Sequence, residues 1–135
     1  MAAFKRGEID LLMTPEIFLS PGHPAELLFE DRYVVAAWGD GKYGDCTMDR
    51  ITYESAAHAS MKMPNGTVTG ESFLLKKAGI TRRIEVETFS FSTLPHLISQ
   101  TDRIATVHKR LAQTIAPMAN LVTYPMPFHM PPVRQ

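Results

Sequence analysis

The sequence predicts an α/β fold in which helices connect the strands of a largely parallel sheet. Short apolar runs alternate along the chain with stretches in which apolar residues recur at helical spacing. The helical stretches are about 8–12 residues long, a length that suits crossovers between parallel strands. The composition allows a buried core, because 44% of the 135 residues are hydrophobic and 21% are charged.

The first part of the chain predicts two strand segments separated by a loop. Residues 9–13 form an apolar run that Thr14 and Pro15 end, so a buried strand is expected there. Proline and glycine crowd residues 15–24, which favours a loop. Residues 27–38 are strongly apolar and predict one long strand, or two strands with a bend near residues 30–32.

The middle of the chain predicts helix, strand and helix in turn. Residues 47–51 can open a helix with Thr47 as its N-cap, and residues 58–63 are expected as a strand. Asn65 and Gly66 mark a turn. Residues 69–78 have helical spacing, and Gly79 stands where a helix-terminating glycine belongs.

The last part continues the alternation into a proline-rich tail. Strands are expected at residues 84–89, 104–107 and 121–124. Ser92 or Thr93 is expected to cap a short helix that reaches Ile98. A further helix over residues 110–116 is expected to stop at Pro117. The four prolines in residues 125–132 are typical of a linker.

Charge and cysteine content exclude several classes of protein. Fourteen basic residues balance fourteen acidic ones, so this segment is not expected to bind nucleic acid by itself. The single cysteine, Cys46, can form neither an internal disulfide nor a zinc cluster, and it fits a reducing compartment. We find no signal peptide and no apolar stretch long enough to span a membrane. A cytoplasmic location is therefore expected.

No residue pattern predicts an active site or a metal site. The five histidines form no pair at metal-ligand spacing, and we expect neither a metal nor a cofactor. A catalytic thiol at Cys46 is a weaker alternative, because no histidine lies near it in the sequence. An acid/base pair of Glu85 and Glu87 is also weaker, since solvated charges on a strand are far commoner. The pair Arg82–Arg83 is either an anion site or, more commonly, an exposed turn. From spacing alone, His58 is a structural residue.

Four segments, in order, resemble the LysR-type transcriptional regulators. They are residues 7–14 (GEIDLLMT), 27–35 (LLFEDRYVV), 78–84 (AGITRRI) and 101–112 (TDRIATVHKRLA). Within that family the chain is most similar to the subgroup of nodulation protein D and the regulators of nitroaromatic degradation. It departs from the family pattern at His108, where proline is common, and at residues 64–66.

The resemblance implies a type 2 periplasmic-binding-protein-like domain with one complete lobe and part of another. Residues 1–36 would belong to the partial first lobe, residues 37–118 to the second lobe, and residues 119–135 to the return segment and tail. The implied protein is not an enzyme. It binds a small aromatic acid or phenol between its lobes, forms homo-oligomers without contacting membranes, and reaches DNA only through a helix-turn-helix domain absent from this chain.

The resemblance also implies which residues line the effector cleft. They lie where strands end at the boundary between the lobes: Thr14, Pro15, His58, Ser90, Phe91 and Thr93. Phe91 would stack on an aromatic ring, while the hydroxyl groups and the imidazole would meet a polar group of the effector. Two alternatives stay open, a stand-alone small-molecule-binding module of the same architecture and a small α/β enzyme.

Overall fold

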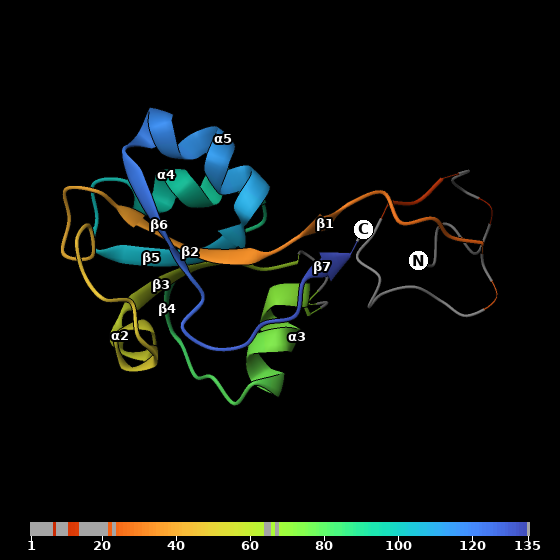
Figure 1. Cartoon of the computed structure of the whole chain (residues 1–135), viewed down its shortest axis with the longest axis horizontal. Coiled ribbons are helices and arrows are strands. Elements are labelled where there is room, and N and C mark those ends of the chain that lie inside the picture. The colour runs from red at the N-terminus through yellow and green to blue at the C-terminus, as the bar shows by residue number, and fades with distance from the viewer. Residues whose placement is uncertain are drawn as a thin grey trace.

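The computed structural model describes residues 7, 11–13, 22, 24–63, 66 and 68–134. Within them a five-stranded sheet of order β4-β3-β5-β2-β6 lies between two layers of helices, α4 and α5 on one face and α2 and α3 on the other (Figure 1). The strands are β2 (Tyr33–Trp38), β3 (Ala57–Met61), β4 (Arg83–Thr88), β5 (Arg103–His108) and β6 (Leu121–Pro125). The helices are α2 (Arg50–Ser55), α3 (Gly70–Lys77), α4 (Leu94–Ile98), which the short 3-10 turn η2 (Phe91–Thr93) precedes, and α5 (Lys109–Ala119).

The predicted largely parallel sheet is confirmed, with β2 as the exception. Strand β3 is parallel to both β4 and β5, whereas β2 is antiparallel to β5 and to β6. Because β5 and β6 both run against β2, they run in the same direction as each other. A separate pair of short antiparallel strands, β1 (Glu30–Asp31) and β7 (Val133–Arg134), lies beyond the sheet (Figure 1).

This topology brings the carboxyl ends of four strands to one edge of the sheet. Tyr33 at the start of β2 also lies there, because it pairs with His108 at the end of β5. We call this edge the carboxyl edge; it comprises Tyr33, Met61, Thr88, His108 and Pro125. Strand β1 and the segment that follows β6 both leave the sheet at this edge (Figure 1).

Both faces of the sheet carry a hydrophobic core. Val34 and Ala36 of β2 pack with Leu94 and Ile98 under α4 and α5. Val35 and Ala37 of the same strand face the opposite side, among core residues that include Tyr53, Leu75 and Ile80. A central strand that is buried on both faces explains why residues 33–37 form an uninterrupted apolar run.

Local signals placed several elements correctly. Thr69 caps α3 by accepting the Ser72 N–H at 3.1 Å, and Gly79 follows the helix with φ of 75°, as predicted. The predicted bend near residues 30–32 is the break at Arg32 between β1 and β2. Residues 11–13 are not in a strand, and the rest of the strand predicted over residues 9–13 lies outside the described residues.

Two predicted helix ends were wrong. Helix α2 begins at Arg50 and not near Thr47, because the Asp49 carboxylate accepts the Thr52 N–H at 2.8 Å and caps the helix. These hydrogen bonds favour the ionised carboxylate and lower the pKa of Asp49. Helix α5 continues through Pro117 to Ala119. It ends instead at Asn120, which has a left-handed conformation with φ of 53°, and whose carbonyl accepts the Gly39 N–H at 2.7 Å.

None of the helices in the described part of the chain has the length and apolar content that a membrane span needs.

Candidate functional site

Three rings from separate segments meet at the carboxyl edge. The ring of Phe91, just after β4, stacks on the ring of His108, with 5.7 Å between centroids and an interplanar angle of 24°. Tyr33 lies directly across the sheet from His108, with 5.0 Å between the ring centroids. Phe91 and His108 are only partly buried, so these two side chains offer aromatic surface to a planar ligand.

Burial keeps the polar groups of this ring cluster uncharged. Burial lowers the pKa of His108, and the nearby Asp31 carboxylate opposes that shift only in part. The imidazole is therefore neutral at pH 7, with one nitrogen that donates and one that accepts. Burial also raises the pKa of Tyr33, so its phenol keeps its proton.

Hydroxyl groups surround the start of η2. The Ser90 and Ser92 hydroxyl oxygens are 2.9 Å apart, and both side chains are exposed. The Ser90 N–H donates to the Thr88 hydroxyl oxygen at 3.3 Å, and the Thr93 N–H donates to the Ser90 carbonyl at 3.2 Å. This turn thus holds hydroxyl groups beside an aromatic ring, which is a suitable arrangement for a planar ligand with a polar end.

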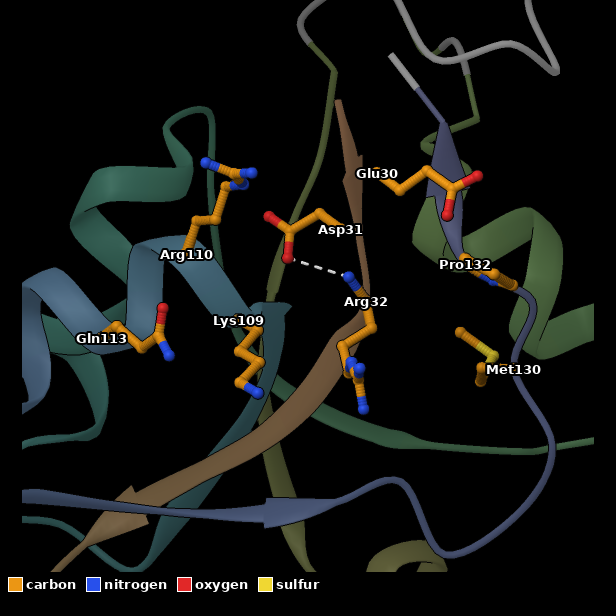
Figure 2. Close-up of a pocket in the computed structure, with 8 residues that line it drawn as sticks. All are labelled: Glu30, Asp31, Arg32, Lys109, Arg110, Gln113, Met130 and Pro132. Atoms are coloured by element: carbon orange, nitrogen blue, oxygen red, sulfur yellow. Dashed lines mark hydrogen bonds between the residues drawn. The ribbon is translucent and has the colours of Figure 1, made fainter. Parts of the chain in front are cut away.

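A cavity of about 620 Å³ opens near the carboxyl edge, between the start of α5 on one side and β1 with the segment before β7 on the other (Figure 2). Figure 2 shows Lys109 and Arg110 of α5 on one side of this space and Met130 and Pro132 on the other. We call it the α5–β1 cavity; its lining residues are Glu30, Asp31, Arg32, Lys109, Arg110, Gln113, Met130 and Pro132. The Lys109 N–H donates to the Arg32 carbonyl at 2.8 Å and joins the start of α5 to the residue between β1 and β2.

The structure brings together three of the six predicted cleft residues. Ser90, Phe91 and Thr93 lie side by side after β4, beside the carboxyl edge. Thr14 and Pro15 lie outside the described residues.

His58 lies elsewhere, in the core near the amino ends of the strands. It pairs with Ile84 and Ile104, it is fully buried, and its Nε2 is 2.6 Å from the Tyr53 carbonyl oxygen. Burial lowers its pKa to about 4, so the ring is neutral. In this arrangement the imidazole cannot reach a ligand at the carboxyl edge, which agrees with the structural role that spacing alone predicts.

Sequence reasoning missed Tyr33, Ser92 and His108 as members of the site. His108 did carry a signal, because it stands where the resembled family commonly has proline. Ser92 lies between two predicted residues, and its hydroxyl was considered only as a helix cap. Tyr33 carried no signal, because its contact with His108 depends on the register between two strands that are remote in sequence.

The other candidate residues are occupied by structural contacts. Glu85 pairs with Arg103 at 2.8 Å, and Glu87 lies 4.0 Å from Lys62, so separate cations hold these two carboxylates. Cys46 is partly buried, and its Sγ lies 3.8 Å from the Tyr43 carbonyl oxygen. Over the described residues, no group of three or more histidine, cysteine or acidic side chains is arranged to hold a metal ion.

The pair Arg82–Arg83 was predicted as either an anion site or an exposed turn; Arg83 is exposed, but for Arg82 both interpretations were wrong. Its side chain is 6% exposed and forms an ion pair with Glu71, whose side chain has no exposed surface. The Arg82 guanidinium also donates to the Ser72 hydroxyl at 3.3 Å. The sequence gives no local sign of this pairing, because Glu71 lies on α3 and Arg82 follows it in a loop.

Comparison with known proteins decides the family. No family model matches the chain. The chain is 37% identical over 129 residues to nodulation protein D 1 of Rhizobium tropici, an alignment that covers 95% of the chain and 42% of that protein. It is 34% identical over 112 residues to nodulation protein D 1 of Bradyrhizobium japonicum, covering 83% of the chain and 35% of that protein. The chain belongs to the LysR-type regulators.

Solved structures agree with membership of the LysR-type regulators. A probable transcriptional regulator from Pseudomonas aeruginosa matches 98% of the chain with a TM-score of 0.86 and 28% identity, over 44% of its own length. The regulatory domain of MexT from the same organism matches 81% of the chain with a TM-score of 0.62 and 21% identity, over 52% of its own length, and this likeness concerns the fold alone. The fold is therefore the type 2 periplasmic-binding-protein-like fold, and the homologues are transcriptional regulators rather than enzymes.

The chain spans about two fifths of the length of the curated LysR-type relatives that it matches.

Proposed function

We propose that this LysR-type chain senses a small aromatic acid or phenol, which binds against Ser90, Phe91 and Thr93 at the carboxyl edge. The observation that carries the proposal is the stacked pair of Phe91 and His108, flanked by the exposed hydroxyl groups of Ser90 and Ser92. Strand β1 and the segment that follows β6 both leave the sheet at this edge. A ligand bound there therefore lies between this lobe and the parts of the protein to which these two segments lead.

The chemistry of the edge fits such a ligand. A ring that stacks on Phe91 gains about 0.5–1.5 kcal/mol beyond the burial of its area. The hydroxyl groups donate to a carboxylate or accept from a phenol, and the neutral His108 imidazole can do either. A domain of the same fold, the effector-binding domain of QuiR, was solved in complex with shikimate, which is itself a small carboxylic acid.

The proposed mechanism is a ligand-operated switch. In it, residues 1–36 belong to a first lobe, residues 37–118 to a second lobe, and residues 119–135 to the return segment. The effector closes or rotates the lobes, and it shifts that equilibrium only by the difference in its affinity for the two arrangements, typically about 1–3 kcal/mol. The protein acts in the cytoplasm and binds DNA through a helix-turn-helix domain outside this chain.

Replacing Phe91 with alanine is expected to weaken binding of an aromatic acid at least about fivefold, or about 1 kcal/mol. The reason is the loss of a stacking surface that is partly exposed at the edge. The measurement is an NMR titration of the chain with 4-hydroxybenzoate, which reports both the affinity and the amides that shift. We expect weak binding, with shifts concentrated at residues 90–93 and 108.

Phe73→Ala is the matched control, because it also removes a phenylalanine ring, 47% exposed, but from α3. It should leave the affinity unchanged. If Phe91→Ala and Phe73→Ala bind the acid equally well, or if the shifts avoid residues 90–93, the proposed site is wrong.

We also propose that the chain self-associates, as expected for a homo-oligomeric regulator. Strand β6 is the last strand at one side of the sheet, and within the described part of the chain it pairs only with β2. A strand edge with unpaired backbone groups recruits another chain. Light scattering should therefore report a mass that rises with concentration above 15.1 kDa. A constant monomer mass up to millimolar concentration would contradict this proposal.

A further inference from the structure

We infer that the α5–β1 cavity is a second binding site, separate from the proposed effector site, and that it takes a small anion with oxygen ligands, such as a phosphate or a carboxylate. The cavity shares no lining residue with the turn at residues 90–93. Its volume of about 620 Å³ is in the usual range for small-molecule sites.

Three cations from two remote segments surround this cavity. Arg32 precedes β2, while Lys109 and Arg110 open α5 (Figure 2). None of the three forms an ion pair with a carboxylate among the described residues, although all three are beside the same space. Arg110 is instead held over the Phe29 ring, with its guanidinium carbon 4.7 Å from the ring centroid.

The two acidic residues of the cavity are already engaged. Glu30 pairs with Arg134 across the β1–β7 ladder at 3.2 Å. Asp31 is 9% exposed, and its Oδ1 accepts the Arg32 N–H at 2.8 Å, as the dashed line in Figure 2 shows. Of the two acids that line the cavity, only Asp31 has no ion pair with a cationic side chain among the described residues. Three cations thus face one unpaired carboxylate, which leaves an excess of positive charge.

Helix α5 increases this positive charge. Its first turn contains no acidic residue, and its N-cap, His108, makes no side-chain hydrogen bond to the helix. The positive end of the helix dipole and two cationic side chains therefore lie together, at a position where acidic side chains would be stabilising. The Lys109 N–H already donates to the Arg32 carbonyl, but the Arg110 and Leu111 N–H groups follow it in the first turn. A bound anion relieves this repulsion, because it accepts from those N–H groups and pairs with the cationic side chains.

The shape of the cavity limits where the anion binds. One wall is α5, and the other is the segment that carries Met130 and Pro132 before β7. An anion held by Lys109, Arg110 and Arg32 thus contacts the segment that leads from β1 into β2. It also lies against the segment that leads from β6 to β7. Asp31 favours ligands that also carry a hydrogen-bond donor, such as a monoprotonated phosphate or a hydroxy acid.

The test is an NMR titration of the whole chain with sodium phosphate and, separately, with succinate, against sodium chloride at the same ionic strength. We expect saturable shifts at the amides of residues 109–111 and at Arg32 with at least one of the two oxyanions, but not with chloride. The two arms distinguish a phosphate site from a carboxylate site. The variants Lys109→Gln and Arg110→Gln should each lower the affinity at least about tenfold.

Lys76→Gln is the matched control, because it removes an exposed cation from the last turn of α3. It should leave the oxyanion affinity unchanged. Equal affinities in Lys109→Gln, Arg110→Gln and Lys76→Gln overturn the inference, as do unsaturable shifts spread over the basic surface. Circular dichroism of each variant checks that it is folded.

Discussion

Replacing Arg82 with methionine is expected to destabilise the chain by about 3–5 kcal/mol. The change leaves the Glu71 carboxylate without its cation, although that side chain has no exposed surface. Its Oε2 already has no hydrogen-bond partner, and the remaining hydrogen bond comes from Ser60 at 3.5 Å. Since domains of this size are typically stable by about 5–15 kcal/mol, the loss would be a large fraction of the total. Urea unfolding at pH 7 measures it.

Arg83→Met is the matched control, because this neighbouring side chain is exposed and should change stability by about 0.5 kcal/mol or less. The double variant Glu71→Met with Arg82→Met should recover most of the loss, because it leaves no unpaired buried charge. A single Arg82→Met variant as stable as Arg83→Met would show that the ion pair is not buried in solution.

The Arg82→Met deficit should also depend on pH. Burial raises the pKa of Glu71 above its ordinary value of 4.5, and losing the opposing attraction of Arg82 raises it further. The folded variant then binds more protons than the unfolded chain, so its stability falls as pH rises above about 4.5. The deficit should therefore be largest near pH 7 and shrink toward pH 4.5.

Acidification should destabilise the wild-type chain through His58 by about 3 kcal/mol. Burial lowers the pKa of this ring from 6.5 to about 4, so the unfolded chain takes up the proton first. The stability from the neutral ring is fully present above pH 6.5 and is lost as pH falls toward 4. The variant His58→Leu lacks this titration, so the difference in stability between wild type and variant should change by about 3 kcal/mol over that interval.

Chemical unfolding at pH 7, 5.5 and 4 provides the measurement. At pH 7 the variant should be less stable by about 1 kcal/mol, because the hydrogen bond to the Tyr53 carbonyl is lost. At pH 4 it should be the more stable of the two. His96→Leu is the control, since this histidine is exposed on α4. If wild type and His58→Leu keep a constant difference at all three values, His58 is not buried as described.

Much of the fold follows from short-range patterns. The cap at Thr69, the glycine at position 79 and the alternation in β4 are local features, and each predicted an element that the structure contains. The errors at Thr47 and Pro117 arose where two local signals competed. Asp49 is a better-placed cap than Thr47, and Pro117 lies in the last turn of α5, where Asn120 ends the helix.

The candidate site, too, contains residues that the sequence could indicate and residues that it could not. The resemblance could point to Ser90, Phe91 and Thr93, because they lie close together in a segment that follows a recognisable strand. The four segments that resemble LysR-type regulators are likewise a property of the sequence alone, and the comparisons confirmed that family. What these signals share is that each is carried by neighbouring residues along the chain.

Only the tertiary structure decided how remote residues meet. The direction of β2 and its register place Tyr33 against His108, and the same placement brings Arg32 beside Lys109. The packing of α3 buries Glu71 with Arg82, and the position of β3 buries His58. Backbone hydrogen bonding and hydrophobic periodicity act over a few residues and leave a mark in the sequence. Strand order and register depend on how the whole core packs, so the contacts that they create have no local signature.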